Sequence, residues 1–283
     1  MRAILIDVPA RTISDELALA EVLSDTRRIS PTDSSASHGA SIGRDGAYGG
    51  NHFDDPHIFV MSVLTKMRTT ASDTIVIYWP RPDGVIANCK RDRAISSFYK
   101  KIARPLMVIH HEGGPEFKSV IAAIDADPAD QVALRLSCQV LWFSERMAAA
   151  LQLPLDLVGT WRLLEEGLLR SARVNERKEV VDRLVESARQ KSLRDLERFI
   201  AKHTTSERYR KIIHRKGETT HQLSVLTRKQ RDSILVIGSR GRVGLAGFFL
   251  GNRAEKVIEY AEGPVVVVKP ELAHVEVADG WAA

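Results

Sequence analysis

Between residues 115 and 270 the chain alternates short apolar runs with longer segments of helical periodicity, and this alternation constrains the fold most. Short continuous apolar runs are typical of strands buried on both faces of a sheet. Strands that alternate with helices predict an α/β fold: an open parallel sheet with helices on both faces. Five strands are predicted: Ser119–Asp125, Pro154–Trp161, a short strand marked by Ile212 and Ile213, Ser233–Gly238 and Pro264–Lys269.

Four helices are predicted between these strands. The first begins with Asp127 as N-cap and Pro128 as the first helical residue. Its apolar stripe consists of Leu136, Val140, Phe143, Met147 and Ala150. The second covers residues 174–203, with an inner side of Val181, Leu184, Val185, Ala188, Leu193, Leu196 and Ile200. The last two helices are predicted at Thr219–Lys229 and Asn252–Ala261.

The first hundred residues are less regular. They contain apolar runs that predict strands at Arg2–Val8, Thr74–Trp79 and Pro105–His110. Between the first two runs, Ser30–Asn51 is rich in Ser, Gly and Asp and predicts a mobile loop.

The N-terminal part also shows a weak internal repeat of the C-terminal part. Its last two strands flank a predicted helix, Arg93–Ala103, in the order that recurs at the C-terminal end of the fold, but the glycines are missing. We therefore expect a truncated copy over residues 1–112, a complete domain over 115–270 and a C-terminal tail over 271–283.

Composition and charge exclude several classes of protein. Hydrophobic residues make up 44% and charged residues 27% of the chain, which is typical of globular proteins. No apolar run approaches the roughly 20 residues of a membrane helix, and the N-terminus does not resemble a secretory signal. Two cysteines are too few for a disulfide framework, so a cytoplasmic location is expected. The net charge of +5 has no basic tail, and its densest stretch, Arg208–Lys216, predicts an edge strand, which argues against nucleic-acid binding.

The most informative segment connects the fourth strand to the last helix and contains three spaced glycines. Gly238 and Gly241 flank a turn, and nine residues separate Gly241 from Gly251, which stands at a helix start. Free N–H groups and the positive end of a helix dipole suit a phosphate. The spacing is neither that of a Walker A loop nor that of the dinucleotide fingerprint. From these residues alone, a phosphate site and a connection that only permits tight packing are both open.

Two other candidate sites are weaker. Asp125 ends the first strand, and we favour helix capping or ligand contact over a role as general base. His110 and His111 are adjacent on a strand and point to opposite faces, so a shared metal is not expected. We therefore predict no catalytic residue and no metal site.

The three glycines, the segment Ala254–Val257 that follows them and the four valines Val265–Val268 together resemble the signature of the universal stress protein family. The resemblance covers roughly residues 115–270. The whole chain is most similar to the branch with two such domains in tandem, the first degenerate. The resemblance implies a Rossmann-like fold of the adenine-nucleotide alpha-hydrolase type, in tandem with a truncated copy.

The resemblance also implies a nucleotide site. In ATP-binding members, the loop glycines and the residues after the last glycine bind phosphates and ribose, and an acid after the first strand meets the adenine. The corresponding positions here are Asp125, Ile237, Gly238, Gly241, Gly251, Asn252 and Arg253. Asn252 replaces the usual Ser or Thr; its amide is expected to cap the helix, but it supplies no hydroxyl, which weakens the expected binding of ATP with Mg²⁺.

We therefore expect a non-catalytic, ligand-binding stress-response protein with a small-molecule ligand, an ATP site in the C-terminal domain and no membrane partner. A weak nucleotide hydrolase and a nucleotide-independent scaffold for small molecules or lipids are the alternatives. In this family the fifth strand pairs antiparallel with its equivalent in a partner domain. Here Pro105–His110 is the natural partner, which predicts an intramolecular pseudo-dimer, and a homodimer stays open.

Overall fold

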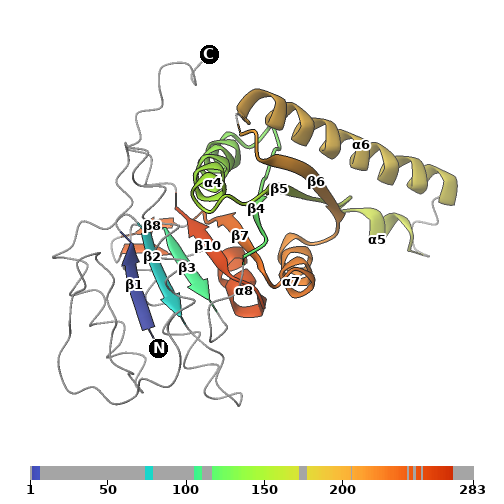
Figure 1. The fold of residues 1–283 in the computed structure, drawn as a ribbon. Helices are drawn as coiled ribbons and strands as arrows, with labels where there is room; N and C mark the ends of the chain where they lie inside the picture. The colour runs from blue at the N-terminus through green and yellow to red at the C-terminus, as the bar shows by residue number, and fades with distance from the viewer. Residues whose placement is uncertain are drawn as a thin grey trace, which may run out of the picture.

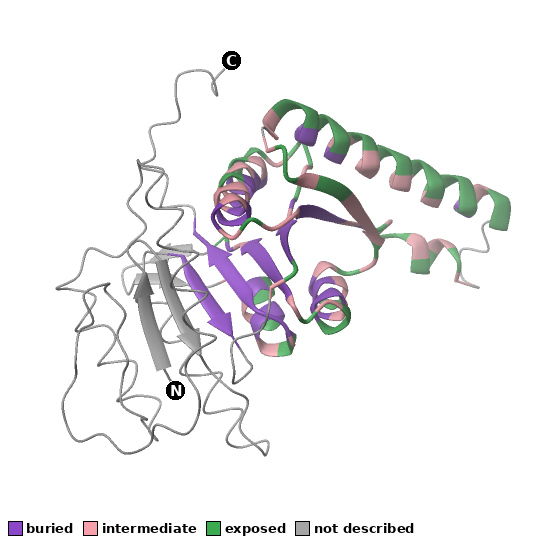
Figure 2. Ribbon diagram, viewed as in Figure 1, coloured by how far each residue is buried: buried purple, intermediate pink, exposed green. Residues whose placement is uncertain are grey.

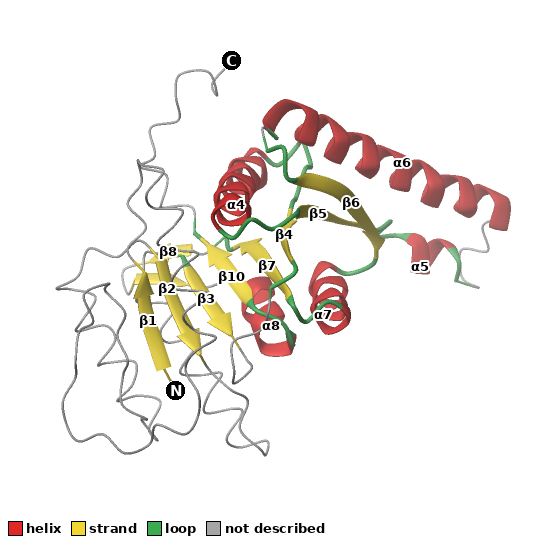
Figure 3. Cartoon of the chain, viewed as in Figure 1, coloured by secondary structure: helices red, strands yellow, loops and turns green. Residues whose placement is uncertain are grey.

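The computed structural model describes residues 2–6, 74–78, 105–109, 117–171, 177–204, 206–240, 242–244, 247–249 and 251–269. Its centre is an eight-stranded sheet in the order β1-β2-β3-β10-β7-β4-β5-β6 (Figures 1 and 3). The predictions for Ser30–Asn51, for a helix at Arg93–Ala103, for His110 and His111 and for the tail at 271–283 lie outside the described residues.

Five neighbouring strands of this sheet are parallel, and they are the five predicted ones. They are β4 (Ser119–Ala123), β5 (Leu155–Trp161), β6 (Tyr209–Lys216), β7 (Ser233–Gly238) and β10 (Val265–Val268). The basic strand β6 lies at the end of the strand order, which confirms the prediction of an edge strand. The strand is eight residues long, longer than its two isoleucines indicated.

The helices lie on both faces of the parallel strands. On one face lie α4 (Gln131–Ala150) and α6 (Lys178–His203), and on the other lie α7 (Thr219–Lys229) and α8 (Asn252–Tyr260) (Figure 1). A short helix, α5 (Glu166–Leu169), follows β5, and a two-stranded hairpin, β8 (Arg242–Gly244) with β9 (Gly247–Phe249), stands between β7 and α8. The predicted α/β fold with helices on both faces is confirmed.

The start of α4 differs from the prediction. Its N-cap is Asp130, whose carboxylate accepts a hydrogen bond from the backbone N–H of Ala133 at 2.9 Å. Asp127 instead accepts from the N–H of Ala129 at 3.0 Å and closes a turn that contains Pro128. Two Asp residues three positions apart therefore have separate functions, and only the second one starts the helix.

The inner side of α6 was predicted correctly only in part. The helix begins at Lys178, and three of its four buried residues lie in its last turns: Leu196, Phe199 and Ile200. Leu184 was expected to face inward but is 43% exposed. The described first half of α6 thus carries fewer sheet contacts than its apolar periodicity indicated.

Three strands from the N-terminal part extend the sheet beyond β10. They are β1 (Arg2–Ile6), β2 (Thr74–Tyr78) and β3 (Leu106–Ile109), all at predicted positions. β3 pairs antiparallel with β10, with Val265 opposite Val108 and Val267 opposite Leu106. The predicted pairing of Pro105–His110 with the valine strand is confirmed, and both strands are fully buried in this arrangement.

The core is formed where the central strands meet α4 and the end of α6 (Figure 2). Strand residues such as Val120, Val236 and Val266 have no exposed surface. One close approach fixes the position of α6, because a Cβ on Gly159 of β5 would lie 2.6 Å from a Leu196 methyl group. A larger residue there would require the Leu196 side chain to shift, so glycine lets the helix lie this close to the strand.

Candidate functional site

A cleft of about 930 Å³ opens at the carboxyl ends of β4, β5 and β7. After β6 the chain crosses over to the far side of β4, so the strand order reverses between β4 and β7. Ligands of open α/β sheets bind at such a reversal. The strand ends form the floor of the cleft. Its walls are formed by residues of α4, α6, α7 and α8. Its volume is within the range of about 300–1,000 Å³ that is usual for small-molecule sites.

Six of the seven residues predicted for the site line this one cleft. They are Asp125, Ile237, Gly238, Gly251, Asn252 and Arg253. The seventh, Gly241, lies outside the described residues. Asp125, just after β4, is thus brought to the same cavity as residues of β7 and α8 that lie more than a hundred positions later in the sequence.

Ser239 ties the end of β7 to the start of α8. Its hydroxyl accepts a hydrogen bond from the N–H of Gly251 at 3.0 Å, and its own N–H donates to the carbonyl of Val268 at 2.9 Å. Ser239 is 1% exposed. This buried hydroxyl fixes the position of the helix start beside the loop, a function that the sequence pattern did not reveal.

The helix start at α8 differs from the prediction in one respect. Gly251 is the N-cap, without a side-chain hydrogen bond, and Asn252 is the first helical residue. The Asn252 amide therefore does not cap the helix, because a residue inside the first turn is past the capping position. In an α-helix the N–H groups of positions 252–254 have no carbonyl within the helix. The residues that carry them line the cleft.

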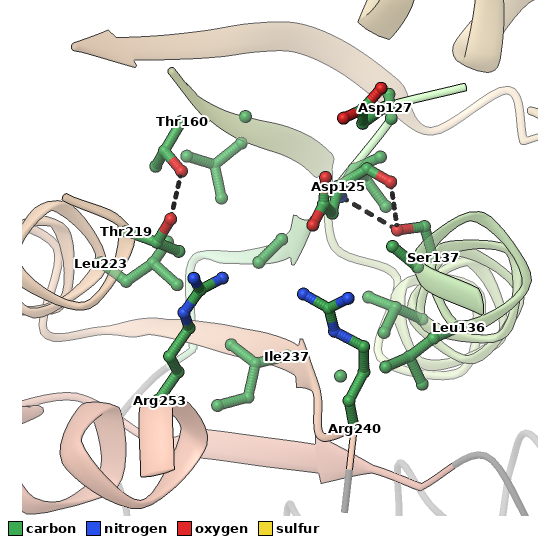
Figure 4. A pocket seen from close by; sticks show the side chains of 18 of the residues that line it. Asp125, Asp127, Leu136, Ser137, Thr160, Thr219, Leu223, Ile237, Arg240 and Arg253 are labelled. Carbon is green, nitrogen blue, oxygen red and sulfur yellow. Dashed lines mark hydrogen bonds between the residues drawn. The ribbon is translucent and has the colours of Figure 1, made fainter. Parts of the chain in front are cut away.

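Two arginines direct their guanidinium groups into the cleft from opposite sides of Ile237 (Figure 4). Arg253 stands in the first turn of α8, and Arg240 lies two residues after the end of β7. Arg240 forms an ion pair with Asp130, the N-cap of α4. The sequence pattern singled out Arg253 but missed Arg240, although it lies within the glycine motif.

The same contacts alter the acidity of Asp130. A hydrogen bond from the Ala133 N–H, together with the positive charge of Arg240, lowers the pKa of this carboxyl. Asp130 is therefore a carboxylate at neutral pH. Its Oδ1 accepts the hydrogen bond that caps helix α4, and its Oδ2 accepts a hydrogen bond from Arg240.

Gly238 is restricted by packing. A Cβ at this position would lie 2.6 Å from Cγ of Leu136 on α4. At Gly251, by contrast, the nearest atom to an added Cβ is the Ser239 hydroxyl oxygen at 3.7 Å, an ordinary contact. The tight-packing explanation therefore applies to Gly238, whereas Gly251 has room for a side chain.

The opposite end of the cleft carries carboxylate and hydroxyl groups. The backbone of Asp125 exchanges two hydrogen bonds with the Ser137 hydroxyl, both at 2.9 Å, which fixes the strand end against α4 (Figure 4). The hydroxyls of Thr160 and Thr219 are 2.7 Å apart and join β5 to α7. Asp125 does not cap α4, because that position belongs to Asp130. The Asp125 side chain is exposed.

Helix α6 contributes a polar rim. Lys191 pairs with Asp195 at 2.9 Å, and the Ser192 hydroxyl is 3.1 Å from Nε2 of His214. His214 also stacks on Trp161 with ring centroids 5.8 Å apart. Burial lowers the pKa of His214, and the positive charge of Arg189 lowers it further, while Glu197 acts in the opposite direction.

Within the described residues, no group of three or more His, Cys, Asp or Glu is arranged to hold a metal ion. In the same part of the chain, no helix is both long and apolar enough to span a bilayer.

Comparisons with known proteins agree with this architecture. A sequence model described as the universal stress protein family matches residues 116–269. Universal stress protein E of Salmonella typhi is 37% identical over 62 residues, 22% of this chain and 20% of that protein. The match thus spans about a fifth of that relative.

Two solved structures from Pseudomonas aeruginosa share the fold. A functionally unknown protein of strain PAO1 has 16% identity and a TM-score of 0.58, over 93% of this chain and 80% of its own. A protein of strain UCBPP-PA14, described as a universal stress protein, has 16% identity and a TM-score of 0.57, over 94% and 84%. At this identity the likeness concerns the fold alone. Because the family match covers more than half of the sequence, this chain belongs to the universal stress protein family.

Proposed function

We propose that this chain is a tandem universal stress protein of the cytoplasm that binds an adenine nucleotide such as ATP in the cleft and does not turn it over. The observation that carries the proposal is the convergence of Asp125, Ile237 and the start of α8 on one cavity of about 930 Å³. The converging groups are of the types that recognise the two ends of a nucleotide.

The phosphates belong at the α8 end of the cleft. The first turn of α8, with the positive end of its helix dipole, and two guanidinium groups border that end of the cleft. The nucleoside belongs at the other end, where the Asp125 carboxylate and the Thr160 and Thr219 hydroxyls supply hydrogen-bonding groups. In this arrangement the described residues bind and orient the ligand.

The antiparallel pairing of β3 with β10 supports the tandem part of the proposal. The three N-terminal strands continue the sheet from the strand at which the parallel part ends. We therefore assign residues 1–112 to a truncated, supporting domain and 115–270 to the ligand-binding domain.

Calorimetric titration of the full chain with ATP, in parallel with an assay for released phosphate, tests the proposal. Gly251→Val places a branched side chain at the helix start, where an added Cβ lies 3.7 Å from the Ser239 hydroxyl oxygen, and we expect it to weaken binding more than Gly251→Ala does. Binding by wild type without phosphate release supports the proposal. Phosphate release identifies a hydrolase instead, and absence of binding leaves a nucleotide-independent scaffold.

A further inference from the structure

The donor set at the phosphate end of the cleft is suited to anions and unsuited to a divalent cation. Mg²⁺ bound with a nucleotide usually takes one or two protein carboxylates in addition to phosphate oxygens. Here Asp130 is occupied by the Ala133 N–H and by Arg240, and Asp127 accepts from the Ala129 N–H. The buried Ser239 hydroxyl already accepts from the N–H of Gly251. Glu255 aside, the described acids near this end of the cleft are thus engaged, and they fit the Mg²⁺ expected from the family resemblance poorly.

Positive charge stands in the same place. Arg240 and Arg253 both point into the cleft, from β7 and from α8 (Figure 4). Arg240 is paired with Asp130, and both guanidinium groups offer a fork of donors that matches phosphate oxygens. Arg240 keeps free donors while it is paired with Asp130, because a guanidinium has five N–H groups.

One acid on α8 needs to be considered. Glu255 also lines the cleft, two residues beyond Arg253. Two helical residues correspond to a rotation of about 200°, so the two side chains leave α8 on nearly opposite sides. Glu255 therefore does not neutralise Arg253 within the helix.

We propose that the cleft takes its nucleotide as the free polyphosphate anion, with Arg240 and Arg253 in the role that a divalent cation has elsewhere. This inference rests on the proposed nucleotide binding. Because Mg²⁺ removes two negative charges from ATP, addition of Mg²⁺ lowers the attraction between ATP and the two arginines. Binding to the wild-type chain is thus strongest when the nucleotide is free of metal.

The test compares calorimetric titrations of the full chain with ATP in EDTA and with ATP in excess Mg²⁺, at equal ionic strength. Wild type is expected to bind at least as tightly in EDTA as in Mg²⁺. Arg253→Gln and Arg240→Gln are each expected to weaken binding in EDTA by about tenfold, and Mg²⁺ is expected to restore part of that loss. Lys256→Gln removes a charge from an exposed position of α8 outside the cleft and is expected to leave affinity unchanged.

The two levels of the proposal fail in different ways. If wild type binds ATP only with Mg²⁺, or if both arginine variants bind as wild type does in EDTA, metal-free recognition is wrong while nucleotide binding stands. If wild type binds ATP under neither condition, the proposed function is wrong as well. Unchanged melting temperatures of the variants show that any loss arises at the cleft.

Discussion

Arg210 on the edge strand β6 holds the fully buried carboxylate of Asp156 on β5 with two hydrogen bonds, 2.8 Å from Nε to Oδ1 and 2.6 Å from Nη2 to Oδ2. The Asp156 side chain has no exposed surface, whereas that of Arg210 is about half exposed. The fork of the guanidinium thus satisfies a carboxylate that no water reaches, and it fastens the last strand to the sheet.

We expect Arg210→Ala to lower the free energy of unfolding by about 1–3 kcal/mol, because it leaves a buried carboxylate without its two donors. The figure is at the lower end for a buried pair because water reaches the guanidinium. Urea denaturation measures the change. Lys211→Ala is the matched control, since its Nζ is 3.9 Å from the same carboxylate and half exposed; an equal loss in both variants would contradict this prediction.

Gly238→Ala is expected to cost about 1–3 kcal/mol of stability, because the added methyl group would meet Leu136 at 2.6 Å and force α4 outward. Gly251→Ala is expected to change stability by less than about 0.5 kcal/mol, since its surroundings leave room. Thermal denaturation compares the two. Gly238→Ala should cost less in a Leu136→Ala background than in the wild-type background; an equal cost in both would show that the clash is not the cause.

Asp130→Asn is expected to tighten ATP binding by about threefold, because it releases Arg240 from its ion pair while an amide oxygen still accepts from the Ala133 N–H. Asp130→Ala removes the cap as well, so its melting temperature should fall below that of Asp130→Asn. Calorimetry and thermal denaturation separate the two effects. Weaker ATP binding by Asp130→Asn would show that the carboxylate serves the ligand directly.

The partly buried imidazole of His214 predicts a pH dependence of stability. Its pKa is lowered in the folded protein from an ordinary value of 6.5, chiefly by burial and then by Arg189. The unfolded chain therefore binds the proton more readily, so stability is present above about pH 6.5 and is lost as the pH falls below it.

His214→Gln should reduce the loss of stability between about pH 7.5 and about pH 5.5, since glutamine does not titrate and can still hydrogen-bond Ser192. His221→Gln, at an exposed position of α7, is the control and should keep the wild-type slope. The measurement is the denaturation midpoint as a function of pH. Equal slopes in all three proteins would assign the effect to other groups.

Met107→Lys is expected to separate β3 from β10, because an ammonium group would be buried in the core that Met107 shares with Val266 and Val268. We expect a loss of more than about 3 kcal/mol, together with aggregation through the exposed valine strand. Limited proteolysis and light scattering detect both. Wild-type behaviour in both measurements would show that the pairing contributes little to the fold.

The strands could be predicted from the sequence because buried parallel strands are nearly continuous apolar runs. The predicted positions of β4, β5, β7 and β10 agree with the structure to within two residues. The start of α4 could not be chosen in this way, because Asp127-Pro128 carries a helix-start signal and Asp130 carries an equally good cap. Only the geometry of the hydrogen bonds decides between them.

In the candidate site, too, some residues could be predicted from the sequence and others could not. Glycine spacing placed the loop beside the helix start, and the family resemblance pointed to Arg253. The contribution of Arg240 depends on Asp130, 110 residues away in sequence, and is visible only once β7 and α4 are neighbours. The constraint on Gly238 likewise comes from Leu136, a contact between β7 and α4 that local sequence does not contain.

The position of β10 between β3 and β7 has a consequence for assembly. A strand with a neighbour on each side has no free hydrogen-bonding edge, so a second copy of the chain cannot add to it. Because both partners of this pairing belong to one chain, dilution does not separate them, in contrast to two subunits joined by the same contact. The valine strand is therefore paired at any protein concentration, and self-association would have to use another surface.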